Sequence, residues 1–378
     1  MARSAADLLA EADGHYDAQR WNEAGVAFER ALAMDASLAR AWYRLGNVRE
    51  EQNRDEDAAA CFERALALDP AYAQAWNNLG GAHQRRGRLE PAADAFRHAI
   101  RADPVLPQPY LNLGRLHVLR GEHALAAECF AAGLAQHPGD ASFAHLVAAA
   151  RGEHTERAPA GYVTQLFDGI ASQFESHLVR DLEYRVPEAL AALVRPALRA
   201  ALAQGAASGA ARAIDLGCGT GLLGAALAQD GAGTAGGIEL AGVDLSPRML
   251  EIAAARGVYA RLEQAEILAA LGRVAPGSIH AVLAADVFIY VGDLAEVFAA
   301  VGRALAPRGV FAFSVEGLED GSYRLLPSGR YAQSPAYLRS LAARTGLAER
   351  RLERTPIRRD GEGFAQGWLA LFERDGER

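Results

Sequence analysis

Two kinds of apolar spacing divide the chain. From about residue 5 to residue 138, apolar and small residues recur three and four positions apart, as in "AAACFERALAL" and "PAADAFRHAI". That spacing is typical of one face of an α-helix. From Ala213 onward, short continuous apolar runs such as "AIDL" and "HAVLAADVFIY" alternate with amphipathic segments. Buried strands joined by helices predict a parallel sheet covered on both faces. We therefore expect an all-α part followed by an α/β part.

The helical part repeats itself with a period of 34 residues. An aromatic residue, a leucine and a glycine recur together, at Trp42, Leu45 and Gly46, at Trp76, Leu79 and Gly80, and at Tyr110, Leu113 and Gly114. The second half of each unit repeats an alanine, a phenylalanine and another small residue, and a proline closes three units, at Pro70, Pro104 and Pro138. Small residues at a fixed spacing let two helices approach closely, so each unit predicts a helical hairpin.

This pattern resembles the tetratricopeptide repeat. The resemblance implies a solenoid over residues 1–152, with about four repeats and a closing helix at "ASFAHLVAAARGE". It also implies a curved groove that holds a protein or peptide partner. The residues expected to face such a groove are polar and mostly cationic or amide-bearing: Arg40, Arg44, Asn47, Asn77, Asn78, Asn112 and Arg115. An ordinary solvated face is the alternative, and the sequence leaves the ligand open.

Composition narrows the function classes. The 378 residues carry a formal net charge of −8, which predicts no broad cationic face for nucleic acid or an anionic membrane. No stretch approaches the length of apolar sequence that a membrane span needs, and the first residues hold acids where a secretion signal needs an apolar core. Three scattered cysteines predict neither a disulfide framework nor a metal site. We expect a cytoplasmic protein without a metal.

The stretch "AIDLGCGTGLLG" is the strongest chemical signal. Its glycines, Gly217, Gly219 and Gly221, follow a predicted strand that ends in Asp215. Glycines in a turn between a strand and a helix permit positive φ angles and close approach of a ligand. The position after Gly221 is Leu222, so the dinucleotide pattern G-x-G-x-x-G is broken. A carboxylate would also repel a pyrophosphate, so Asp215 favours a cationic ligand.

"DLGCGTG" resembles the first motif of the class I methyltransferases that use S-adenosyl-L-methionine. The resemblance implies a Rossmann-like α/β domain over residues 162–378 with a mainly parallel seven-stranded sheet, after a linker at 153–161. It implies that Asp215 and the glycine turn hold the methionine end of the cofactor, and that Asp244 accepts the ribose hydroxyls. Further cofactor contacts implied by the family pattern are Tyr162 at the carboxylate, Leu245 and Met249 at the adenine, and Glu266 at the adenine amine.

Candidate acceptor-side residues follow the fourth predicted strand. In this fold that strand ends near the transferred methyl group, so Asp286 and Tyr290 are the first candidates for orienting or deprotonating the acceptor. Their alternative role is to cap the next loop. The segment from Tyr162 resembles the helices that small-molecule methyltransferases fold over the cofactor, in which His177 could act on the substrate or merely pack on the sheet. The loop carrying Tyr323, Arg330 and Tyr331 is either a lid for an acidic substrate or an ordinary surface loop.

These features lead to one main hypothesis and two alternatives. The main one is an S-adenosylmethionine-dependent methyltransferase acting on a small metabolite or natural-product intermediate, with the repeats docking a partner or carrier protein. The first alternative is a protein methyltransferase whose repeats bind the target polypeptide. The second is a non-catalytic repeat scaffold with a cofactor-sensing domain, against which the intact "DLGCGTG" motif argues.

Overall fold

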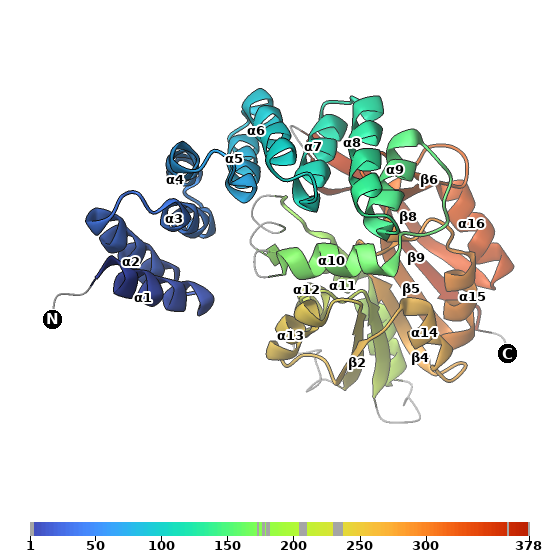
Figure 1. The fold of residues 1–378 in the computed structure, drawn as a ribbon. Helices are drawn as coiled ribbons and strands as arrows, with labels where there is room; N and C mark the ends of the chain where they lie inside the picture. The colour runs from blue at the N-terminus through green and yellow to red at the C-terminus, as the bar shows by residue number, and fades with distance from the viewer. Residues whose placement is uncertain are drawn as a thin grey trace. The chain divides into compact units, whose positions relative to one another are not determined.

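The computed structural model describes residues 4–171, 174, 175, 178, 182–203, 210–229, 237–360 and 363–376 (Figure 1). The chain separates into two compact units, Met1–Arg151 and Gly152–Arg378. Across the ranges given above, no helix combines the length and the apolar character that crossing a bilayer requires.

The first unit is a row of helical hairpins closed by a single helix. Its helices are α1 (Ala5–Asp17), α2 (Trp21–Met34), α3 (Ala39–Glu51), α4 (Asp55–Leu68), α5 (Ala73–Arg85), α6 (Leu89–Ala102), α7 (Pro107–Leu119), α8 (His123–Gln136) and α9 (Ala141–Arg151). The predicted all-α solenoid is confirmed: α1 to α8 form the four hairpins, and α9 stands where the sequence predicts a closing helix.

A repeated glycine–phenylalanine contact explains the sequence period. A Cβ atom added at Gly46, Gly80 or Gly114 would lie within 2.3–2.5 Å of the nearest ring atom of Phe62, Phe96 or Phe130. Those rings are fully buried. Because no side chain larger than hydrogen fits there, the glycine of each first helix lets the phenylalanine of the second helix fill the hairpin core. The last contact joins Gly133 of α8 to Phe143 of α9 in the same way.

The aromatic residues Trp42, Trp76 and Tyr110 also donate hydrogen bonds. The indole Nε1 of Trp42 donates a hydrogen bond to the carbonyl of Ala36, and that of Trp76 donates to the carbonyl of Pro70, both at 2.9 Å. The hydroxyl of Tyr110 donates to Pro104 in the equivalent place. The aromatic side chain therefore ties each hairpin to the turn that precedes it. This accounts for tryptophan and tyrosine sharing one position.

The second unit is an α/β domain around one sheet. Its strands are β1 (Ala211–Leu216), β2 (Ile238–Asp244), β3 (Arg261–Gln264), β4 (Ile279–Ala284), β5 (Leu305–Gly317), β6 (Tyr323–Leu325), β7 (Tyr331–Gln333), β8 (Leu347–Asp360) and β9 (Gly363–Arg374). Its helices are α10 (Ala160–Ile170), α11 (Val186–Ala203), α12 (Leu222–Ala228), α13 (Pro247–Ala255), α14 (Ile267–Gly272), α15 (Ala295–Ala304), α16 (Pro335–Arg344) and the 3₁₀ turn η3 (Phe288–Tyr290).

The sheet is mostly parallel, as the sequence predicts. Strands β3, β2, β1, β4 and β5 are adjacent in that order and parallel, while β9 pairs antiparallel with β5, and β8 with β9. The expected number of seven strands is wrong for the described residues, because the sheet has nine. The two extra strands, β6 and β7, form a short hairpin whose second strand pairs with the end of β5.

Each face of the sheet has its own core. Along β1, Ile214 and Leu216 pack with helices α14, α15 and α16, whereas Ala211 and Ala213 pack with α11 and α12. Alternate residues of β4 and β5 divide in the same way. Helices therefore cover both faces, as continuous apolar strands require, and ligands reach such a sheet at the carboxyl ends of its strands.

Residues 153–161 do not form the expected linker. Gly292 donates its backbone N–H to the carbonyl of Glu156, and Ala158 donates to the carbonyl of Tyr290. A β-bridge also joins Arg157 to Val291. Charge, glycine and proline predict a linker from local sequence, but these backbone groups find partners 130 and more residues away. The segment belongs to the α/β unit and lies beside the loop after β4.

Candidate functional site

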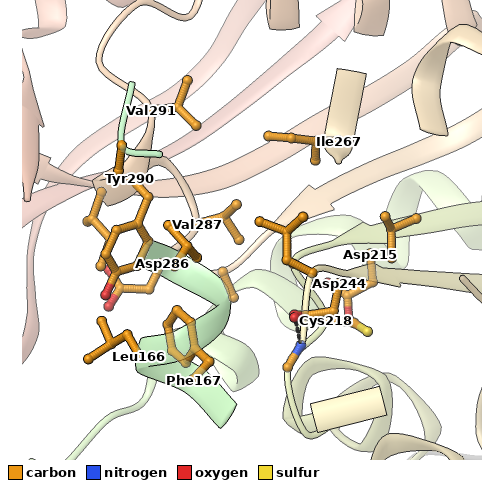
Figure 2. Close-up of a pocket in the computed structure, with 18 of the residues that line it drawn as sticks. Leu166, Phe167, Asp215, Cys218, Asp244, Ile267, Asp286, Val287, Tyr290 and Val291 are labelled. Atoms are coloured by element: carbon orange, nitrogen blue, oxygen red, sulfur yellow. Dashed lines mark hydrogen bonds between the residues drawn. The ribbon is translucent and has the colours of Figure 1, made fainter. Parts of the chain in front are cut away.

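A cavity of about 420 Å³ opens at the carboxyl ends of β1, β2 and β4 (Figure 2). Its walls come from the glycine turn after β1, the end of β2, the loop after β4 and the helix α10. Figure 2 shows Asp215, Cys218 and Asp244 on one side of this space and Asp286 and Tyr290 on the other. We call these two sides the glycine-turn end and the Tyr290 end. Cavities of this size suit small molecules.

The glycine turn lies close to the cavity because its backbone is left-handed. Gly217, Gly219 and Gly221 have φ angles of +63°, +52° and +88°. A Cβ atom at Gly217 would lie 2.5 Å from a methyl group of Val287. A Cβ atom at Gly219 would have only the Phe174 ring within 4.0 Å. Gly219 therefore presents bare backbone to the cavity, where a ligand can approach closely.

Asp215 is a buried carboxylate with one free oxygen. It is 1% exposed, and its Oδ2 accepts a hydrogen bond of 2.7 Å from the hydroxyl of Tyr259. Among the described residues its Oδ1 is buried without a partner, and Asp215 lines the cavity. Burial raises the pKa of Asp215 to about 7, although the Tyr259 hydrogen bond opposes this. A cation placed at Oδ1 would satisfy this oxygen and favour its ionised form.

Asp244 connects the two loops that form the glycine-turn end. Its Oδ2 accepts the backbone N–H of Gly219 and its Oδ1 accepts that of Ser246, both at 2.8 Å. Each carboxylate oxygen has a further lone pair, so Asp244 can still accept ligand hydroxyls. Burial raises its pKa, and the backbone hydrogen bonds counteract the rise. Leu245 and Glu266 line the cavity beside it.

Helix α10 supplies an apolar wall. The residues Val163, Leu166, Phe167 and Ile170 line the cavity and are spaced so that they share one helical face. The Phe167 ring meets the Tyr290 ring edge-on at 5.6 Å. This face belongs to the segment around Tyr162, whose sequence resembles the helices that small-molecule methyltransferases fold over the cofactor. Its side chains therefore give the cavity an apolar wall.

Asp286 is held in an ion-pair network that the sequence did not reveal. Strand β4 ends at Ala284, two residues before it, and Asp286 has a φ of +58°. Its Oδ2 accepts a hydrogen bond of 3.0 Å from Arg358, which is 3% exposed and also binds Glu316 at 2.7 Å. Burial lowers the pKa of Arg358, but the two carboxylates outweigh it and raise the pKa above its usual value. The Oδ1 of Asp286 is buried and has no partner in the part of the chain that the structure describes.

Tyr290 is a neutral phenol at the opposite end from Asp215. It lies in η3 and is 9% exposed. Burial raises its pKa to about 12, against the opposing charge of Arg330. At neutral pH its hydroxyl is therefore a hydrogen-bond donor or acceptor and not a base.

The structure brings most of the predicted site residues together. Those that line the cavity are Asp215, Gly217, Gly219, Asp244, Leu245, Glu266, Asp286 and Tyr290. Tyr162, Gly221 and Met249 are not among the lining residues; Met249 is fully buried on α13, and Tyr162 lies behind Tyr290 with ring centres 6.5 Å apart. His177 lies outside the described residues. Sequence reasoning missed Tyr259 and Arg358, which no local motif marks.

The ion pair of Asp286 gives a testable stability difference. Replacing Asp286 with Asn leaves buried Arg358 with Glu316 alone, so we expect the free energy of unfolding to fall by about 1–3 kcal/mol. The control is Glu319→Gln, which removes an ion pair with Arg354. The side chains of this pair are 56% and 70% exposed, so the variant should change the free energy of unfolding by less than about 0.5 kcal/mol. Urea denaturation measures both. Equal losses in the two variants would show that the buried ion pair of Asp286 contributes no more to stability than the exposed pair of Glu319.

The second unit has an open, mostly parallel sheet, a left-handed glycine turn after β1, and carboxylates at the ends of β1 and β2. These features define a Rossmann-like α/β domain. A family model described as "Methyltransferase domain" matches residues 214–311. A model described as "Tetratricopeptide repeat" matches residues 9–60 and 51–107. The chain is thus a fusion of tetratricopeptide repeats with a methyltransferase domain. Among the described residues, no group of three or more His, Cys, Asp or Glu side chains is placed to hold a metal ion.

Three solved structures are similar to part of the chain. "Crystal structure of MamA" is 24% identical, covers 35% of this chain and 78% of its own, and has a TM-score of 0.35. "Arabidopsis OM64 TPR domain" is 20% identical, covers 30% and 93%, and scores 0.29. A structure described as "Conversion of a Disulfide Bond into a Thioacetal Group during Echinomycin Biosynthesis" is 22% identical, covers 48% and 83%, and scores 0.34. No curated protein matches the chain.

Proposed function

We propose that the second unit is a methyltransferase that uses S-adenosylmethionine and acts on a small molecule. The observation that carries this proposal is the buried, free Oδ1 of Asp215 beside the bare backbone of Gly219. A cavity-lining carboxylate with one oxygen that has no partner among the described residues suits the ammonium group of the cofactor. The same carboxylate would repel the pyrophosphate of a dinucleotide.

Residues at one end of the cavity would bind the cofactor, and residues at the other end would bind the acceptor. When bound, S-adenosylmethionine supplies a methyl group on a positively charged sulfur. Asp215, oriented by Tyr259, would hold the ammonium, and Asp244 would accept the ribose hydroxyls while fixing Gly219. The apolar face of α10 excludes water, which favours a displacement that depends on positioning. Tyr290 would orient the acceptor by a hydrogen bond.

The apolar character of the cavity supports a small-molecule acceptor over a polypeptide. Leu166 and Phe167 line the cavity beside Tyr290. Such a wall suits a compact apolar compound, free or attached to a carrier, more than a peptide backbone, whose N–H and C=O groups need partners.

We propose that the repeats hold a protein or peptide partner. A chain of amide hydrogen bonds joins successive repeats, from Asn78 to Asn47 and from Asn112 to Asn77, each at 2.9 Å. Asn77 donates to Asn78 and so connects the two pairs. Of these half-buried amides, Asn78 and Asn112 are one repeat of 34 residues apart. Unused amide donors and acceptors in a row can bind the backbone of an extended peptide.

The direct test of the proposed activity is cofactor binding by the full-length protein. We expect S-adenosylmethionine and its product S-adenosylhomocysteine to bind with micromolar affinity, about −8 kcal/mol. Isothermal titration calorimetry measures this, with NAD as the control ligand. Tighter binding of NAD than of either adenosyl compound would overturn the proposal.

The pKa of Asp215 predicts how cofactor affinity depends on pH. Because Asp215 must be ionised to pair with an ammonium group, and burial raises its pKa to about 7, each pH unit below about 7 should weaken S-adenosylhomocysteine binding about tenfold. At higher pH the amine of the ligand loses its own proton, and affinity falls again. At about pH 6, calorimetry in buffers of different ionisation enthalpy should detect proton release on binding. An affinity that stays constant from about pH 5.5 to 7.5 would exclude this role for Asp215.

A further inference from the structure

Arg330 is placed at the cavity by a rigid hairpin. It lies between β6 and β7, where its carbonyl accepts the N–H of Leu326 at 2.7 Å. The next residues anchor the hairpin: Tyr331 is fully buried, and the amide of buried Gln333 donates to the carbonyls of Phe288 and Val291 at the two ends of η3. Arg330 lines the same cavity, and its charge acts electrostatically on Tyr290. The hairpin thus fixes Arg330 relative to η3.

None of the described residues balances the charge of Arg330. Three arginines line the cavity. Arg157 pairs with Glu296 at 3.0 Å, and Arg358 pairs with Asp286 and Glu316. Within the described ranges, the side chain of Arg330 has no acidic partner and no hydrogen bond. A half-buried cation beside an apolar wall is costly unless something pairs with it.

The position of Arg330 indicates that its partner is a negatively charged group of the methyl acceptor. The carboxylates Asp215, Asp244 and Glu266 belong to the glycine-turn end, where a cationic ligand is favoured. The Tyr290 end combines residues of α10, the carboxylate of Asp286, which is paired with Arg358, and the side chain of Arg330, which has no acidic partner among the described residues. One positive charge matches one carboxylate, which guanidinium binds in a bidentate manner, whereas a phosphate would leave an excess negative charge in an apolar space.

We propose that the methyl acceptor is an apolar compound that carries a carboxylate, and that this carboxylate pairs with Arg330. This inference rests on the proposed methyltransferase function. The apolar body of the acceptor lies against Leu166 and Phe167, and its acid group reaches the hairpin. Arg330 is then the residue that selects acidic acceptors over neutral compounds of the same shape.

The test uses full-length protein saturated with S-adenosylhomocysteine and three matched pairs of probes. The pairs are phenylacetate and phenylacetamide, octanoate and octanamide, and indole-3-acetate and its amide. We expect at least one acid to bind at least about tenfold more tightly than its amide by calorimetry. Arg330→Gln should abolish that preference while changing S-adenosylhomocysteine affinity by less than about threefold, and Arg330→Lys should restore part of the preference because it keeps the charge.

Arg324→Gln is the matched control, because Arg324 is an exposed arginine of the same hairpin that does not line the cavity. It should leave the preference for acids intact. The proposal is wrong if no acid binds, if acids and amides bind equally, or if Arg330→Gln weakens S-adenosylhomocysteine about tenfold or more, since Arg330 would then serve the cofactor carboxylate. Failure of the unmodified protein to bind S-adenosylhomocysteine is a separate result and would overturn the proposed function instead.

Discussion

Replacing Asp215 with Asn is expected to weaken the binding of S-adenosylhomocysteine about 100-fold or more. The substitution keeps the shape of the side chain and an oxygen that can accept the Tyr259 hydroxyl. It removes the negative charge that would pair with the ammonium, and loss of one partner from a buried charge pair typically costs about 2–5 kcal/mol. Calorimetry at about pH 8, where the wild-type carboxylate is ionised, measures the effect.

The stability of the Asp215→Asn variant separates a ligand-binding role from a structural one. The folded-state pKa of about 7 lies above the unfolded value near 3.9, so ionisation of Asp215 is less favourable in the folded protein. Its contribution to stability is present below about pH 4 and is lost as the pH rises towards about 7. At about pH 8 we therefore expect the variant to be at least as stable as the wild type.

Asp244→Asn is the matched control for this experiment. Both oxygens of Asp244 accept backbone N–H groups, and an amide offers only one acceptor. This variant should lose stability by about 1–3 kcal/mol. If Asp215→Asn instead loses stability and keeps full affinity, Asp215 is a structural residue and the cofactor assignment fails.

In the repeats, replacing Gly80 with Ala is expected to lower the free energy of unfolding by about 3 kcal/mol. The new Cβ atom would lie 2.5 Å from the ring of Phe96, which is fully buried. Because the ring has no free space to move into, the two helices of the hairpin must separate, and overpacking of this kind typically costs 1–3 kcal/mol or more. Thermal or urea unfolding followed by far-UV circular dichroism measures the loss.

Gly81 provides an adjacent control on the same helix. A Cβ atom there would meet only the end of the Arg85 side chain, at 3.4 Å. Alanine is favoured over glycine in a helix by about 1 kcal/mol, so Gly81→Ala should stabilise the protein slightly. Opposite signs for these neighbouring substitutions would identify the contact with Phe96 as the cause. Similar effects of both would mean that the hairpin core tolerates the extra methyl group.

Several features of the fold were predictable because they depend on local sequence. The period of 34 residues fixes which helix faces meet, since a repeat packs mainly against itself and its neighbours. The contacts of Gly46 with Phe62 and of Gly80 with Phe96 have the same spacing in the sequence. The glycine turn was equally readable, because its positive φ angles require glycine whatever surrounds it.

Other features were beyond local patterns. The linker expected at residues 153–161 is paired to the loop after β4, and the hairpin of β6 and β7 raises the strand number above seven. Tyr162 and Met249 fit a family pattern by position, but neither lines the cavity. In each case the deciding partner is distant in sequence, so the composition of the segment itself contains no signal of it.

By itself, then, the sequence determined the repeat architecture, the parallel α/β domain and the acids that stand at the ends of β1 and β2. Only the tertiary structure decided how those acids are used. The hydroxyl that orients Asp215 comes from a residue 44 positions away, and the arginine that holds Asp286 comes from 72 positions away. Periodicity and turn chemistry record interactions between near neighbours in the chain. Burial, ion pairing and the unbalanced charge of Arg330 depend on which strands and hairpins the fold places side by side.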